Sequence, residues 1–428
     1  MLKKILNIRH KYKGSFIGHV LMLMTGTALA QSIAILASPI LSRLYSPDDF
    51  GVFAVYMAIV SMVSLVSTGR YELSIMLPND EEDAASIFVL SFIIVIFVSL
   101  ASFILPLVLR NFLAVFFKGR LSSVMLYLIP ITVFLTGTYQ LLNYWAIAKK
   151  NFSRLAVNRV YQSGTTAGLQ LASGMFASGA LGLVWGQIAG QCVGSGILGW
   201  KTWKEDGKKL KSVTKEKMVH QAVIYKKFPL YSLIADFINN AANQVPNFLL
   251  GFFFGSSTVG FFFLPQRVLG SPSSLVASSV LDVFKERASR DYRTCGNCLD
   301  IYVKTFKHLL LISFLPFMAL FFLSPMLIPF IFGAQWKIAG EYAQILSVMF
   351  FFRFISSPLS YVLYIAQRQN YDLVWQAFLF IFTVIAISIG VYFKSAKTSI
   401  TCFALSYSIM YIIYLFLSYD AAKGARIS

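Results

Sequence analysis

The sequence predicts an all-α polytopic membrane protein with twelve transmembrane helices, arranged as two six-helix parallel repeats around a central cavity. Three observations predict this fold: the composition, the apolar segments of spanning length, and the placement of basic residues. Of the 428 residues, 57% are hydrophobic and 13% are charged, whereas a soluble domain carries about 25% charged residues. A lipid bilayer is therefore the first partner that the sequence predicts.

A helix that crosses a bilayer needs about 20 mainly apolar residues, and twelve segments meet this requirement. They cover residues 16–42, 51–69, 84–109, 122–147, 155–176, 179–200, 228–254, 258–283, 301–323, 339–365, 371–393 and 397–419. A shorter apolar stretch, 325–333, is interpreted as a surface turn or as the end of the ninth helix. The basic segment 1–15 precedes the first apolar segment without a signal-peptide cleavage pattern, which indicates an uncleaved first helix.

The basic residues predict the orientation. If the N-terminus lies in the cytoplasm, 28 of the 37 Lys and Arg residues fall on the cytoplasmic side, 7 fall outside and 2 lie within helices. Cytoplasmic loops are enriched in Lys and Arg, so both termini are expected in the cytoplasm. The net charge of +19 therefore reflects membrane topology, and no nucleic acid partner is expected.

The longest basic connection divides the chain into three parts. We expect an N-terminal six-helix bundle (1–200), a basic cytoplasmic linker (201–227) and a C-terminal six-helix bundle (228–428). The linker is either a short amphipathic segment against anionic headgroups or a solvated connection. The halves resemble each other weakly, for example at FGVF (50–53) and VGFF (259–262). An even number of spans in each half predicts parallel repeats, with a cavity between them.

Polar residues within the predicted spans indicate what the cavity binds, because such residues are costly in hydrocarbon. Four residues of the seventh span lie within a narrow arc at helical periodicity, and these are Asp236, Asn240, Asn243 and Asn247. Polar stripes on other spans include Gln31 on the first and Arg159 on the fifth. Stripes that face one centre predict a hydrophilic cavity that takes a polar solute.

Two arginines, Arg267 and Arg353, lie far from the ends of their predicted spans. Arginine stays protonated, and its planar fork suits phosphate. Either these residues bind an anionic group of the solute, such as pyrophosphate, or they pair with carboxylates such as Asp236 or Asp282. Asp236 in turn either couples transport to a proton or Na⁺, or neutralises an arginine.

The sequence predicts no catalytic residues, no metal site and no cofactor. The four His residues are scattered and there is no phosphate-binding loop for ATP. Cys295 and Cys298 form a single C-x-x-C and are interpreted as reduced loop thiols. The acidic residues at 72 and 80–83 are interpreted as a solvated loop. Three glycines at intervals of four in the sixth span, at 186, 190 and 194, predict close helix packing.

Several segments resemble Wzx-type polysaccharide repeat-unit flippases. They are QSIAILASPILSRLYSPDDFG (31–51), GRYE (69–72), LP (77–78) and FGAQWKIAGEYA (332–343). These flippases form the polysaccharide transporter family of the multidrug/oligosaccharidyl-lipid/polysaccharide exporter superfamily, and their fold is MATE-like. The resemblance extends over essentially the whole chain.

The resemblance implies a flippase that moves undecaprenyl-diphosphate-linked oligosaccharide repeat units across the bacterial inner membrane by alternating access. The units would serve O-antigen, capsule or exopolysaccharide synthesis. Coupling to H⁺ or Na⁺ is expected by analogy with the superfamily, and the polysaccharide polymerase and chain-length regulator are expected partner proteins. A net cationic cavity, which Arg267, Arg353 and Arg159 would supply, suits this substrate.

Three alternatives remain open on the sequence. A multidrug exporter of the same superfamily would share the fold, but organic cations favour acidic or apolar walls. A lipid II flippase would normally carry two further C-terminal helices. A membrane-embedded polysaccharide polymerase or ligase would be an enzyme, and it usually has a large extracytoplasmic loop, whereas the outer loops predicted here are short.

Overall fold

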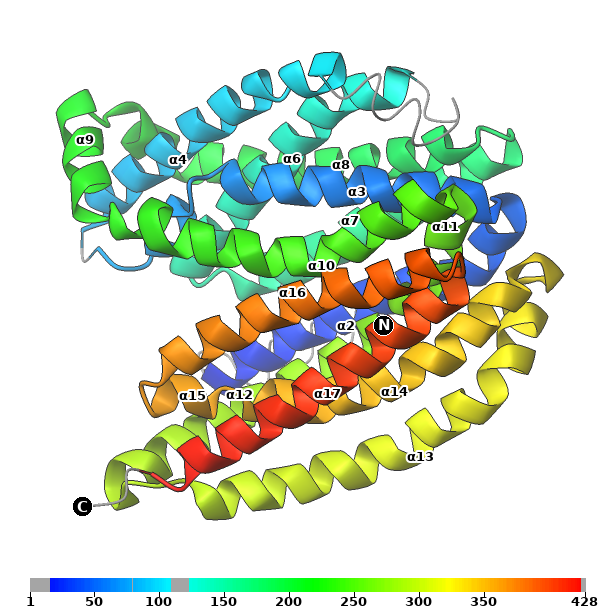
Figure 1. Ribbon diagram of the computed structural model, residues 1–428. Helices are drawn as coiled ribbons and strands as arrows, with labels where there is room; N and C mark the ends of the chain where they lie inside the picture. Colours follow the sequence, from blue (N-terminus) through cyan, green and yellow to red (C-terminus); the bar gives the residue numbers. More distant parts are fainter. Residues whose placement is uncertain (1–15, 79, 109–122, 425–428) are drawn as a thin grey trace. The chain divides into compact units, whose positions relative to one another are not determined.

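The computed structural model describes residues 16–78, 80–108 and 123–424 (Figure 1). All regular secondary structure in these ranges is helical, and each of the twelve predicted spans overlaps a helix. The predicted all-α fold is therefore confirmed. The basic segment 1–15 and the predicted helix ends at 109 and 122 lie outside the described residues.

The helices form two compact units. One unit contains residues up to Tyr45 together with Val52–Asn240, and the other contains Ser46–Gly51 and the chain from Ala241 onward. The unit boundaries thus fall next to the start of α3 (Pro47–Val66) and within α10 (Leu233–Phe254). Residues 201–224, predicted as part of a linker, are largely helical and belong to the first unit.

The first unit contains most of α3, from Val52 onward, and the start of α10, up to Asn240. Its other helices are α2 (Phe16–Leu44), α4 (Glu81–Ala101), α6 (Ser123–Ala148), α7 (Phe152–Met175), α8 (Ala180–Lys211) and α9 (Lys215–Ile224), with short turns η1 (Tyr71–Ser74) and η2 (Phe228–Ser232). Helix α7 packs against both α2 and α8, and α6 packs against α8 and α4. A core cluster that includes Trp145 and Phe88 joins α6 to α4.

The glycines of α8 allow close helix packing, as predicted, with Gly186 and Gly190 against α7 and Gly194 nearest to Tyr139 of α6. A Cβ atom on Gly186 would lie 2.4 Å from Cγ of Gln170, and one on Gly190 would lie 1.8 Å from Oγ1 of Thr166. Both distances are far below van der Waals contact. The glycines therefore set the spacing of these two helices, as small residues do in membrane helix pairs.

The segment predicted as a linker or amphipathic segment is ordered. Helix α8 continues to Lys211, and α9 packs on α4. Lys209 pairs with Glu81 and Lys217 pairs with Glu82, while the Nζ of Lys149 lies 2.9 Å from Oε1 of Glu81. These ion pairs attach the segment to the first turn of α4, while Lys209 and Lys217 stay about half exposed to solvent.

Of the acidic residues predicted as a solvated loop, Glu81 and Glu82 are more than half exposed, as predicted, but they begin helix α4 and do not lie in a loop. Asp80 is the N-cap of α4, where its side chain accepts a hydrogen bond from the backbone N–H of Glu82 at 3.1 Å. Acidic side chains in a first helical turn complement the helix dipole. Glu72 lies in η1 and has no exposed surface, so it belongs to the interior of the unit.

The second unit is built around α14. Its helices are α11 (Ser256–Pro265), α12 (Ser271–Cys295), α13 (Leu299–Phe332), α14 (Lys337–Leu359), α15 (Val362–Ile365), α16 (Gln369–Tyr392) and α17 (Ala396–Ala422), with short turns η3 (Gln266–Gly270) and η4 (Ala334–Trp336). Helix α14 packs against α11, α12, α13 and α17. Of the two interpretations of 325–333, the end of the ninth helix is correct: α13 continues through Pro325 and Pro329.

The start of α3 packs on α11 within this unit. A Cβ atom on Gly51 would lie 1.8 Å from the carbonyl oxygen of Ser256, and a Cβ atom on Gly260 would lie 1.8 Å from the carbonyl oxygen of Pro47. The two backbones are therefore in direct contact. Trp336, which is fully buried, closes this region with its ring 5.1 Å from that of Phe50.

Nine helices in the described ranges are long and apolar enough to cross a membrane. They correspond to nine of the twelve predicted spans. The other three predicted spans correspond to α7, to η2 with α10, and to α11 with η3 and α12. Polar residues are most frequent in these three segments and lower their hydropathy. Their polar faces are therefore the candidates for a functional site.

Candidate functional site

The polar residues predicted from the sequence divide between the two units. The first unit contains Gln31, Arg159, Asp236 and Asn240. The second unit contains Asn243, Asn247, Arg267 and Arg353. The predicted central cavity depends on the arrangement of the two units and stays a prediction. Each unit has polar sites of its own.

Arg159 lies against the polar face of α2. Its Nη1 donates a hydrogen bond to Oγ1 of Thr27 at 2.5 Å, and the hydroxyl of Ser163, one turn further along α7, donates to the carbonyl oxygen of Ala30 at 2.6 Å. Gln31 is one turn beyond Thr27 on α2 and is partly exposed. The structure therefore places two of the predicted substrate-binding residues on one α2–α7 pair.

Asp236 forms an ion pair with Arg70. Its Oδ2 lies 2.7 Å from Nη2 of Arg70, and its side chain remains 41% exposed. Of the two roles considered for Asp236, neutralisation of an arginine is therefore the one with a visible partner. The arginine in this pair is Arg70, which lies in the same unit as Asp236. The alternative in which Asp236 pairs with Arg267 or Arg353 concerns the arrangement of the two units and stays a prediction.

Arg70 also contacts a second carboxylate. Its Nη1 lies 3.3 Å from Oε1 of Glu72, and this same oxygen accepts a hydrogen bond from Nε2 of Gln140 at 2.7 Å. Arg70 adopts a positive φ of 61°, which is uncommon for a residue other than glycine. Sequence reasoning missed this cluster because Arg70 and Asp236 are far apart along the chain.

The asparagines of α10 differ in their surroundings. Asn240 is partly buried and Asn243 is exposed. Asn247 is only 6% exposed, and its Nδ2 donates to Oε1 of Gln244 at 3.2 Å. Its Oδ1 is buried without a hydrogen-bond donor among the described residues. Asn247 therefore keeps an unused acceptor inside the second unit.

Arg267 and Arg353 lie on neighbouring elements of the second unit. Arg267 is in η3, a π-helical turn that follows Pro265, and it is partly buried. Arg353 is on α14 and is exposed. Among the described residues of the second unit, neither arginine has a carboxylate partner in an ion pair. Both guanidinium groups therefore remain available to an anion.

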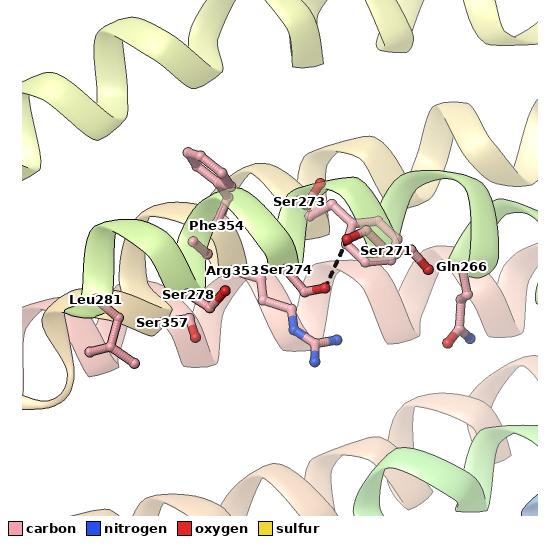
Figure 2. Close-up of a pocket in the computed structure, with 12 residues that line it drawn as sticks. Gln266, Ser271, Ser273, Ser274, Ser278, Leu281, Arg353, Phe354 and Ser357 are labelled. Carbon is pink, nitrogen blue, oxygen red and sulfur yellow. Dashed lines mark hydrogen bonds between the residues drawn. The ribbon is translucent and has the colours of Figure 1, made fainter. Parts of the chain in front are cut away.

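A pocket of about 360 Å³ lies between α12 and α14, with Arg353 in its wall. Figure 2 shows the guanidinium group of Arg353 and the amide of Gln266 extending to the same side, next to serines of α12. The polar lining residues are Gln266, Ser271, Ser273, Ser274, Ser278, Arg353 and Ser357. The side chain of Arg267, the neighbour of Gln266, does not line this pocket.

Several of these serine hydroxyls already donate to their own helix. Ser273 donates to the carbonyl oxygen of Leu269 at 2.6 Å, and Ser274 donates to that of Ser271 at 2.9 Å. A hydroxyl that donates in this way still has lone pairs that accept hydrogen bonds. The pocket therefore presents one cation together with several acceptors, a combination that suits a phosphate linked to hydroxyl-rich groups.

Sequence reasoning identified Arg353 but missed the serines of α12. Their signal is spacing: Ser271, Ser274 and Ser278 recur at i, i+3 and i+7, which places them on one helix face. Serine is common in membrane helices, and it becomes informative here because the same face continues from Gln266. In the described ranges, no group of His, Cys, Asp and Glu is arranged to hold a metal ion.

Solved structures of transporters share this fold. The inward closed conformation of the lipid II flippase MurJ superposes with a TM-score of 0.71 at 14% identity, over 94% of this chain and 87% of that one. An inward-facing multidrug resistance MATE transporter of the MOP superfamily gives a TM-score of 0.66 at 14% identity, over 92% and 93%. A MOP superfamily transporter from Pyrococcus furiosus gives 0.61 at 14% identity, over 94% of both chains.

At such low identity these likenesses establish the fold alone. They agree with the MATE-like, twelve-helix architecture expected from the sequence. No curated protein sequence matches the chain. A family model for polysaccharide biosynthesis proteins matches residues 40–341, which is more than half of the chain. This multi-pass membrane protein with a transporter fold therefore belongs to the family of polysaccharide biosynthesis proteins.

Proposed function

We propose that this protein is a flippase that moves undecaprenyl-diphosphate-linked oligosaccharide repeat units from the inner to the outer leaflet of the bacterial inner membrane. The units would then enter O-antigen, capsule or exopolysaccharide synthesis. Family membership and the transporter fold support lipid-linked sugar transport in general. The observation that carries the specific proposal is Arg353, which lies in a serine-lined pocket and has no carboxylate partner among the described residues of its unit.

The chemistry of the pocket matches the two polar parts of such a substrate. The guanidinium group of Arg353 can bind a diphosphate oxygen through charge-assisted hydrogen bonds. The serine oxygens and the amide of Gln266 can bind sugar hydroxyls. Arg267, Arg159, Gln31 and the asparagines of α10 are proposed as further polar contacts along the translocation path. The lipid tail would remain in the bilayer.

The same observation argues against multidrug export. An organic cation would be repelled by Arg353 and would find no carboxylate among the residues that line this pocket. A membrane-embedded polymerase or ligase remains the alternative from another class, and we propose that the protein is not an enzyme. The polysaccharide polymerase and the chain-length regulator are proposed partner proteins.

The test is complementation of a strain that lacks the gene. Arg353→Ala should abolish surface polysaccharide and trap single lipid-linked repeat units on the cytoplasmic leaflet. Loss of one charge-assisted interaction, about 1.5–3 kcal/mol, corresponds to roughly 10- to 150-fold weaker substrate binding. Arg353→Lys should restore part of the activity.

The matched control is Arg368→Ala, which removes an arginine that already pairs with Asp420 at 3.0 Å outside the pocket. It should leave surface polysaccharide unchanged while the protein level stays constant. Normal polysaccharide in the Arg353→Ala strain would refute the role of the pocket. Repeat units that accumulate on the outer leaflet instead would indicate a polymerase and refute the flippase.

We also propose that Asp236 couples transport to H⁺ or Na⁺. Neutralisation of Asp236 by either cation would weaken its ion pair with Arg70 and leave Glu72 as the carboxylate partner of that guanidinium group. Asp236→Asn should therefore remove the dependence of transport on the ion gradient in reconstituted vesicles. An unchanged dependence would assign the coupling to another residue. The cytoplasmic location of both termini is proposed on the basis of the Lys and Arg distribution.

A further inference from the structure

A second cavity of the second unit lies on another side of α12, between α12 and α13 near the turn that connects them. It measures about 510 Å³. Helix α13 packs mainly along α14 and has few contacts with α12, so the two helices diverge from their shared turn and leave a groove. This groove has no part in the proposed function, because none of its lining residues belongs to the Arg353 pocket.

The wall that α12 contributes is apolar for most of its length. Val276, Val280 and Val283 line it, at a spacing that places them on one helix face. Val276 is 40% exposed and Val283 is 59% exposed. In a protein with a transporter fold, such a wall is suited to a hydrocarbon chain. The groove therefore offers a track for a lipid tail.

The end of the groove nearest the turn is cationic. Arg287, one turn beyond Val283 on the same face of α12, meets Lys304 and His308 from α13. Within the described residues Arg287 has no ion pair. Lys304 pairs with Asp300 at 2.6 Å, but both side chains are more than half exposed, so this pair is weak and open to competition.

His308 adds a hydrogen-bonding group beside these two cations. Its Nδ1 lies 2.6 Å from the carbonyl oxygen of Lys304, so Nδ1 carries the proton and donates to that oxygen. The groove thus combines a guanidinium, an ammonium and an imidazole at one end with a valine-lined track that leads away from them. This is the polarity of a single amphipathic molecule with an anionic head.

We propose that this groove binds one anionic glycerophospholipid, with the phosphate between Arg287 and Lys304 and one acyl chain along the valines. Arginine binds phosphate oxygens bidentately, and basic residues near a membrane surface favour anionic lipids. A zwitterionic lipid carries an ammonium group that the same cations repel. A diphosphate bearing an oligosaccharide needs more polar groups than this one cationic end supplies.

The experiment is native mass spectrometry of the full chain, purified after reconstitution with equal amounts of phosphatidylglycerol and phosphatidylethanolamine. The intact protein should retain one phosphatidylglycerol. Arg287→Gln should reduce this retention about fivefold, the factor expected for the loss of one basic residue near a membrane surface. Arg287→Lys keeps the charge and should retain most of the lipid.

Arg290→Gln is the matched control. Arg290 lies three residues further on the same helix, pairs with Glu286 at 3.6 Å and does not line the groove. It should leave lipid retention unchanged. A second variant, Val280→Trp, fills the track and should displace the lipid although Arg287 remains. Arg287 and Val280 lie outside the Arg353 pocket, so variants at these positions test the lipid groove alone. The proposed function is tested separately, by the surface polysaccharide of the Arg353 variants.

Equal retention of the two phospholipids would overturn the proposal. Equal loss in Arg287→Gln and Arg290→Gln would also overturn it, because the effect would then be one of general surface charge. Displacement of phosphatidylglycerol by undecaprenyl diphosphate at equal concentration would reassign the groove to the polyprenyl carrier. Retention by the Val280→Trp variant would refute the position of the acyl chain.

Discussion

Glu72 provides the sharpest test of the packing in the first unit. Its carboxylate is completely buried, contacts Nη1 of Arg70 at 3.3 Å and accepts a hydrogen bond from Gln140 at 2.7 Å. Glu72→Ala would remove the buried partner of Arg70, which is itself only 14% exposed. Breaking a buried ion pair by removing one partner costs about 3–5 kcal/mol.

Asp236 is the matched comparison, because it pairs with the same arginine at the shorter distance of 2.7 Å but is 41% exposed. Exposed ion pairs contribute about 0–1 kcal/mol. Burial, and not distance, should therefore decide which of the two variants is destabilised more. We expect Glu72→Ala to destabilise the protein by at least about 3 kcal/mol and Asp236→Asn by at most about 1 kcal/mol.

The assay is thermal unfolding of the purified protein in detergent, followed by intrinsic fluorescence. For a domain of 150–250 residues, 1 kcal/mol shifts Tm by roughly 2–4 °C. Glu72→Ala should therefore lower Tm by at least about 6 °C, and Asp236→Asn by no more than about 4 °C. Equal shifts for the two variants would refute the argument from burial. Recovery of Tm in the double variant Glu72→Ala with Arg70→Ala would confirm that the cause is the guanidinium group of Arg70 without its buried partner.

Two further predictions concern helix packing and thiol chemistry. Gly190→Ala places a Cβ 1.8 Å from Oγ1 of Thr166 and should lower the free energy of unfolding by about 1–3 kcal/mol. The control Gly196→Ala on the same helix meets no atom within 4 Å and should be neutral or stabilising by up to about 1 kcal/mol. Equal Tm values for the two variants would contradict the close approach of α7. Cys295 is exposed, whereas burial, followed by the charge of Asp291, raises the pKa of the Cys298 thiol to about 11. The thiolate is the nucleophile in alkylation. Peptide mass spectrometry after alkylation should therefore find Cys295 modified at pH 8 and Cys298 modified only as the pH approaches 11. Equal rates of modification at pH 8 would contradict this prediction.

Hydrophobicity alone was sufficient to predict the helices. Each predicted span overlaps a helix because apolar length is a local property of the sequence, and in a bilayer the backbone must satisfy its hydrogen bonds within the segment. Helix ends were predicted less well. Pro325 and Pro329 suggested a break, yet α13 continues through both, since membrane helices tolerate proline where neighbouring groups satisfy the freed carbonyls.

Charge pairing was the part that the sequence could not reveal. The ion pairs of Glu81 and Glu82 were not predicted because their partners, Lys209 and Lys217, are 128 and 135 positions away. The same holds for Arg70 and Asp236. For Arg267 and Arg353 the position within an apolar span was informative in itself, because an arginine there must contact a carboxylate, water or a ligand. Their lack of a carboxylate partner became known only from the structure.

The contact between Gly51 and Gly260 has a particular symmetry. Each glycine faces the carbonyl oxygen of the residue four positions before the other, and both equivalent pairs, Gly51 with Gly260 and Pro47 with Ser256, are separated by 209 positions. Residue i meets residue j in the way that j meets i, which is the rule for the interface of a twofold homodimer. The two contacts between a glycine and a carbonyl oxygen are therefore equivalent to each other. As a consequence, the two glycines share one constraint, and the cost of a double alanine substitution should not equal the sum of the two single costs.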